Sequence, residues 1–167
     1  MVSQQVIKGF RMLNTIDIFN NLTSILNKAG IRYNIDIPGT SIAGNFSLNS
    51  HPVSTMFRLS VSNGAVVNHT YLLGFSHPIT PQLLQFINLI NSRLLFGNFE
   101  CVNATGIALR FRYALPGTMI KDEYVGEVLA LLQLPSLMFS RYMNGFFAVV
   151  NQGVLPQDAA YMCDGVR

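Results

Sequence analysis

The side chains with the clearest potential for chemistry are three histidines, at positions 51, 69 and 77. A metal-binding or catalytic histidine needs a second group at a defined spacing, either another ligand or a carboxylate that orients its ring. His51 and His77 each precede a proline, whereas His69 lies in a predicted strand, so no two share such a spacing on one element. We therefore predict structural or solvent-exposed roles for all three, with no metal and no cofactor.

The acidic residues and cysteines also argue against catalysis. Asp122, Glu123 and Glu127 resemble paired carboxylates, but acids near the start of a predicted helix already complement the helix dipole. Cys101 and Cys163 lie far apart and belong to no cysteine or histidine cluster. The sequence also lacks the phosphate-binding loop, the dinucleotide glycine fingerprint, GxSxG and HExxH. We predict no catalytic residue, and a protein that is not an enzyme.

Three arginines form the candidate basic face. Arg58, Arg110 and Arg112 alternate with apolar residues on two predicted strands, which is the pattern for one exposed face of a sheet. Such a face could bind phosphate or an acidic peptide. The polar positions beside them hold small side chains, we expect no aromatic residue for base stacking there, and the net charge is only +3. The pattern favours a solvated face over a nucleic-acid site.

The composition indicates a partner. Half of the residues are hydrophobic and 11% are charged, against about 25% charged residues in an average soluble protein. A chain so poor in charge exposes apolar area unless a partner covers it, so we expect a homodimer or a bound protein client.

The location of the protein is predicted from three features. The amino-terminal segment lacks the apolar core of a signal peptide, and two separated cysteines fit a reducing compartment. The longest apolar stretch, residues 134–150, contains Arg141 and Asn144 and is shorter than the roughly 20 residues of a membrane span. We expect a cytoplasmic protein with no membrane segment.

The elements that position these residues follow from periodicity and turn residues. Helical spacing with Gly30 as a C-terminal cap predicts a first helix, and Thr80-Pro81 predicts the start of a second. Asn63-Gly64 is a strong hairpin signal, and the turn of a later hairpin falls at residues 103–106. The predicted elements are a helix at 16–29, strands at 31–37, 42–49, 57–62 and 65–73, a helix at 81–94, and a hairpin at 95–113.

The last part of the chain returns to helical periodicity. Pro135 is expected to end or kink a helix that starts after Pro116-Gly117, and the next segment, residues 136–152, is apolar on nearly all sides. One side of that segment must pack in the core, and the other is a candidate interaction surface or dimer seam. The residues of this candidate surface are Met138, Phe139, Tyr142, Met143, Phe146 and Phe147.

These elements define an α+β fold. We predict a mostly antiparallel sheet with helices packed on it, in the order helix, three to four strands, helix, two strands, helix, helix. No low-complexity linker divides the sequence, so residues 1–167 are predicted to form a single domain, with a flexible segment at residues 1–14.

Two segments of the sequence resemble a known family. INSRLLFGNFECVNATGIALRFRYAL (residues 90–115) and MFSRYMNGFFAVVNQGVLPQDAA (residues 138–160) are similar to the helix-to-hairpin segment and the closing helix of the YbjN family of proposed bacterial sensory-transduction regulators. The resemblance implies a fold like that of type III secretion chaperones, small α+β domains that commonly pair and bind extended segments of other proteins.

The leading functional prediction is therefore a non-enzymatic interaction domain, chaperone-like or a regulatory adaptor, that dimerises and binds a segment of a partner protein. A nucleic-acid-associated regulator that uses the basic strand face is one alternative. A small-molecule sensor is another, and it would require an enclosed polar pocket.

Overall fold

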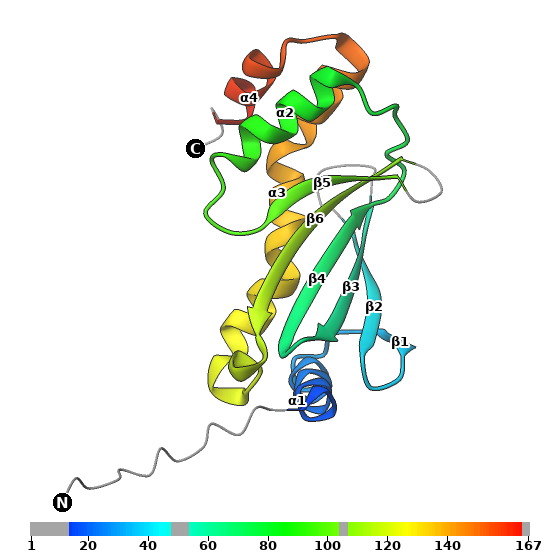
Figure 1. The fold of residues 1–167 in the computed structure, drawn as a ribbon, viewed down its shortest axis with the longest axis vertical. Helices are drawn as coiled ribbons and strands as arrows, with labels where there is room; N and C mark the ends of the chain where they lie inside the picture. The colour runs from blue at the N-terminus through cyan, green and yellow to red at the C-terminus, as the bar shows by residue number, and fades with distance from the viewer. Residues whose placement is uncertain (1–13, 48–53, 104–106, 165–167) are drawn as a thin grey trace, which may run out of the picture.

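The computed structural model describes residues 14–47, 54–103 and 107–164. Within these ranges the chain forms six strands and four α-helices (Figure 1). Two short 3-10 turns lie between β6 and α3. The elements are α1 (Thr15–Lys28), β1 (Asn34–Ile37), β2 (Ser41–Ser47), β3 (Ser54–Ser62), β4 (Ala65–Leu72), α2 (Pro81–Asn91), β5 (Asn98–Asn103), β6 (Ile107–Pro116), α3 (Val125–Gln152) and α4 (Pro156–Asp164).

The strands form a single antiparallel sheet in the order β1-β2-β3-β4-β6-β5. Four of the five neighbouring pairs join strands that are consecutive in the chain. The exception is the pair of β4 and β6, which α2 and β5 separate in the sequence. The α+β prediction, with a mostly antiparallel sheet and helices packed on it, is confirmed. The predicted turn residues 104–106 lie outside the described residues.

The helix boundaries follow the local signals in the sequence. At the end of α1, Gly30 has φ +70°, and the N–H groups of Gly30 and Ile31 donate to the carbonyls of Asn27 and Leu26. This pair of hydrogen bonds defines a Schellman cap, which requires a left-handed backbone conformation at Gly30. At the start of α2, Thr80 Oγ1 accepts from the Leu83 N–H at 3.1 Å. Both predicted caps are confirmed.

The long helix α3 differs from the prediction at Pro135. We expected a break or kink there, but the helix continues through Pro135 from Val125 to Gln152. Pro135 has no N–H to donate to the carbonyl of Leu131, four residues earlier. The side chain of Asn68 on β4 replaces that donor, because its Nδ2 lies 2.7 Å from the Leu131 oxygen.

Asn68 is completely buried, and its other polar atom is also satisfied. Asn68 Oδ1 accepts a 3.0 Å hydrogen bond from the hydroxyl of Thr70, which is buried as well. A buried amide with both ends paired is tolerated in an apolar core. The sheet and α3 are therefore joined by a polar contact that the missing proline donor makes necessary.

The core has two parts, and α3 contributes to both. Its first half packs with α1 against β2, β3 and β4, and its second half packs with α2 and α4 against β5 and β6. Figure 1 shows α3 running behind the sheet, with α1 near one end and α2 and α4 at the other. The four described helices thus lie on one side of the sheet, and none of the residues in the described ranges forms a helix over its other face.

Replacing Asn68 by Ala should lower the free energy of unfolding by about 1–3 kcal/mol, because the Leu131 carbonyl loses its donor while buried. The cost should be smaller in a Pro135→Ala background, where residue 135 regains an N–H. Urea unfolding of the four proteins in this double-mutant cycle measures the coupling, with Asn45→Ala on β2 as the exposed control. Equal costs in both backgrounds would contradict the assignment.

Candidate functional site

The predicted surface on the closing helix is for the most part inside the molecule. Phe139, Tyr142, Met143 and Phe146 are at most 1% exposed, and only Met138 and Phe147 are partly exposed. The ring of Phe99 on β5 lies 5.3–5.7 Å, centroid to centroid, from three of these residues. Because α2, α4 and the sheet surround this half of α3, the apolar residues form core, and the expectation of an exposed seam is corrected.

An apolar hollow does open nearby, between the α2–β5 connection and the middle of α3. We call it the apolar groove; it has a volume of about 200 Å³. Leu95 is 90% exposed and Phe96 is 60% exposed at its edge, and Leu137 on the same stretch of α3 is 60% exposed. The groove is lined by Arg93, Leu94, Leu95, Phe96, Leu134, Met138, Arg141 and Tyr142.

The sequence did not reveal this groove because residues 95–97 were predicted to belong to the hairpin. In the structure β5 begins at Asn98, and Gly97 has φ +69°, a conformation that favours glycine. A side chain at position 97 would also clash with the Phe111 ring. Gly97 is thus the signal that separates Leu95 and Phe96 from the strand.

Two arginines give the apolar groove a cationic border. Arg93 of the α2–β5 connection and Arg141 of α3 both pair with one carboxylate, Asp164 at the end of α4. The second pair is longer, with 3.6 Å between Arg141 Nη2 and Asp164 Oδ1. Two guanidinium groups share a single acid here, so the border keeps a net positive charge.

The basic face is a real surface of the sheet, and we call it the open sheet face. Cross-strand pairing places Arg58 of β3 opposite His69 of β4, and His69 opposite Arg112 of β6. Tyr71 lies opposite Arg110 in the neighbouring row. The three predicted arginines therefore share one face. The expectation that this face lacks aromatic residues is wrong, because β4 contributes both Tyr71 and His69.

Two of these three arginines are held by acids. Arg58 Nε lies 3.1 Å from Asp36 Oδ2, and Arg110 Nε lies 2.6 Å from Glu100 Oε2. Within the part of the chain that the structure describes, Arg112 is exposed and forms no ion pair. The unbalanced positive charge of the open sheet face therefore lies at Arg112.

The charges on the open sheet face shift the pKa values of His69 and Glu100. Partial burial, together with the charges of Arg110 and Arg112, lowers the pKa of His69. Burial acts to raise the pKa of Glu100, but hydrogen bonds from Asn98 and Arg110 and the nearby arginine charges lower it overall. The face thus favours a neutral imidazole and an ionised carboxylate.

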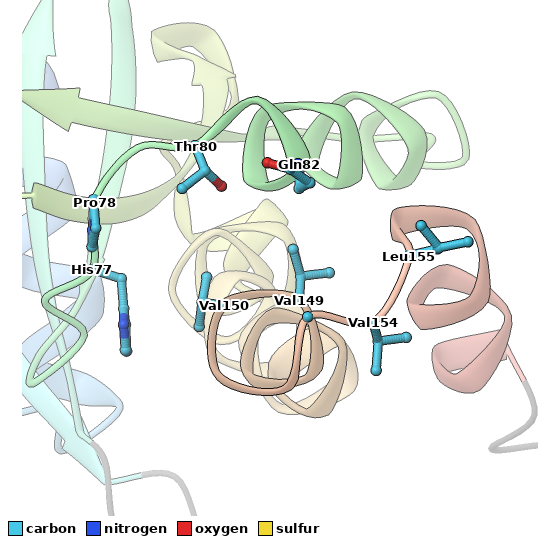
Figure 2. Close-up of a pocket in the computed structure, with 9 residues that line it drawn as sticks. His77, Pro78, Thr80, Gln82, Val149, Val150, Val154 and Leu155 are labelled. Carbon is cyan, nitrogen blue, oxygen red and sulfur yellow. The ribbon is translucent and has the colours of Figure 1, made fainter.

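A second hollow, of about 320 Å³, lies where the start of α2 meets the end of α3 (Figure 2). Val149, Val150, Val154 and Leu155 make most of its wall, and the polar groups come from His77, Thr80 and Gln82. No acid or second histidine lines it. It is an open, largely apolar depression and not the enclosed polar pocket that a small-molecule sensor would require.

The remaining predicted chemical groups are not brought together. Among the described residues, no three His, Cys, Asp or Glu side chains gather as metal ligands; His51 lies outside these residues. Burial raises the pKa of Cys101 and Cys163, so both thiols are poor nucleophiles. Asp122 pairs with Lys28 at 2.6 Å, an ordinary surface contact.

Comparisons with known proteins identify no relative: no protein-family model, curated protein or solved structure matches this chain. The resemblance to the YbjN family therefore stays a prediction. In the described ranges, no helix combines the length and the hydrophobicity that crossing a membrane requires.

The lowered pKa of His69 predicts a pH effect on stability. An unfolded histidine titrates near about 6.5, so below that pH the unfolded chain binds the proton more readily and stability falls. His69→Gln should reduce the loss of stability between about pH 7 and pH 5. In an NMR titration of the ring, Arg112→Gln should raise the pKa of His69. An unchanged pKa in that variant would contradict this electrostatic account.

Proposed function

We propose that this protein is a non-enzymatic interaction domain, chaperone-like or a regulatory adaptor, that binds a segment of another protein in the apolar groove. The observation that carries the proposal is the exposure of Leu95 and Phe96, 90% and 60%, beside a hollow that is itself apolar. Burying one such side chain is worth about 1.5–3 kcal/mol. A partner that covers both Leu95 and Phe96 therefore obtains a large part of the free energy of a typical binding interaction from these two side chains.

The groove also defines the chemistry of the partner segment. Its volume of about 200 Å³ suits one or two large side chains and is below the usual range for a small-molecule site. Arg93 and Arg141 stand at its border with one shared acid. The segment we propose therefore places an apolar side chain in the groove and an acidic one beside the arginines.

Three further features support this assignment. The chain is poor in charged residues, at 11%, which favours a protein partner. Its α+β architecture agrees with the type III secretion chaperone-like fold that the YbjN resemblance implies. Cys101 and Cys163 are both free thiols, which fits a site of action in the cytoplasm.

Peptides selected from a displayed random library should combine a large apolar residue with an acidic residue. The double variant Leu95→Asp/Phe96→Ser should lose at least about tenfold in affinity for them, because about 1.4 kcal/mol of apolar contact corresponds to that factor. Leu84→Asp on α2, an exposed leucine outside the groove, is the matched control. Undiminished binding by the double variant, or no selected peptide at all, would contradict the proposal.

We also propose a homodimer, formed through the β1 edge of the sheet. The two edges differ. At β5, the side chain of Asn91 bonds both the N–H and the carbonyl of Phe99, at 2.8 and 2.9 Å, and so occupies the backbone groups of Phe99 on that edge. Among the described strands β1 pairs with β2 alone, and its Ile35 and Ile37 are 59% and 56% exposed. An unprotected apolar edge favours pairing with another strand.

Light scattering at micromolar concentration should then report a dimer for the wild-type protein. Ile35→Lys/Ile37→Lys should shift it toward monomer, because charged side chains on an edge strand oppose strand pairing. Ile16→Lys on α1, also an exposed isoleucine, should remain dimeric. A wild-type monomer, or an unaffected double variant, would refute the proposed dimer.

A further inference from the structure

The open sheet face is unlike the apolar groove in shape and in chemistry. The described helices pack on the opposite side of the sheet, and the groove and the hollow at His77 include no residue of this face. No large apolar side chain of the face is among the strongly exposed ones in the described residues. A broad, polar surface that no described helix covers favours an extended partner over a small molecule that needs enclosure.

Three arginines are spread over this face at distances that the sheet dictates. Arg58 and Arg112 stand two strands apart, which corresponds to about 10 Å between their backbones, and Arg110 and Arg112 are about 7 Å apart along β6. Asp36 and Glu100 hold two of the guanidinium groups in place. Arg112 retains an uncompensated charge next to His69, so an anionic group from a ligand is favoured at that position.

An aromatic ring lies within this set of cations. Tyr71 is partly exposed, stands beside Arg110 across the β4–β6 pair, and shares its side of β4 with His69. In the neighbouring row, Asn98 of β5 lies opposite Arg112 and adds an amide beside Arg112 and His69. An aromatic ring next to arginines suits a nucleotide, because the base can stack on the ring while the phosphate contacts an arginine. An acidic side chain of a peptide would not stack on the ring.

We propose that the open sheet face binds single-stranded nucleic acid, with a base stacked on Tyr71 and the adjoining phosphate at Arg112 and His69. Asp36 and Glu100 balance the charges of Arg58 and Arg110, so Arg112 is the main phosphate contact and the other two arginines border the bound strand. This site shares no residue with the apolar groove, so the nucleic-acid proposal does not depend on the proposed protein binding.

Fluorescence anisotropy with a labelled 20-nucleotide uridine strand at low salt tests the proposal. Binding should weaken as salt rises, and Arg112→Ala should reduce the slope of log affinity against log salt by about 0.7, the value for one phosphate on a single strand. Tyr71→Leu should weaken binding by about 5- to 150-fold, the effect of losing one stacked base. Lys28→Ala, on α1, removes a cation elsewhere and should leave the affinity unchanged.

Two further measurements keep the result decisive. Circular dichroism melts of Tyr71→Leu and Arg112→Ala show whether both variants fold, and the shift of the wild-type His69 ring resonance on adding the strand reports contact without any substitution. No binding at low salt, folded variants that bind like wild type, or an unmoved His69 resonance would overturn the proposal. Equally strong competition by polyglutamate would overturn the nucleic-acid assignment in favour of an acidic peptide.

Discussion

The hydrogen bond from Asn68 to the Leu131 carbonyl is the constraint on which the architecture depends. A proline inside a helix removes one backbone donor, and in an apolar core an unpaired carbonyl is costly. Asn68 supplies the donor from the sheet, so α3 continues from Val125 to Gln152 and takes part in both halves of the core. The same bond ties α3 to β4, at the middle of the sheet.

The continuity of α3 determines where the surfaces of the protein lie. Because α3 and the other three α-helices occupy one side of the sheet, the apolar side chains in the second half of α3 are used in packing. None of the described helices covers the opposite side of the sheet. Exposed apolar residues therefore occur where the packing ends, at Leu95 and Phe96 and on the β1 edge. A protein segment fits the apolar groove because that surface is apolar. A nucleic acid fits the open sheet face because that surface is cationic.

Charge is scarce in this chain, so its placement carries information. Most of the described cations are matched: Lys28, Arg58, Arg93, Arg110, Lys121 and Arg141 each have an acidic partner. In the described ranges only Arg32 and Arg112 have no such partner. Arg112 is an unmatched arginine on a sheet face, beside a histidine whose pKa is lowered by burial and by nearby arginine charges, and so differs from an ordinary solvated cation.

The sequence by itself determined the local structure: the Schellman cap at Gly30, the Thr80 cap, the Asn63-Gly64 hairpin and the alternation of the strands. Each depends on interactions within a few residues, so local residue types and spacing are enough to predict it. Only the tertiary structure decided that α3 passes Pro135, that Phe139 and Phe146 are buried, and that Tyr71 stands among the arginines. Periodicity separates the two faces of an element, but long-range contacts choose which face is covered and which side chains meet across strands.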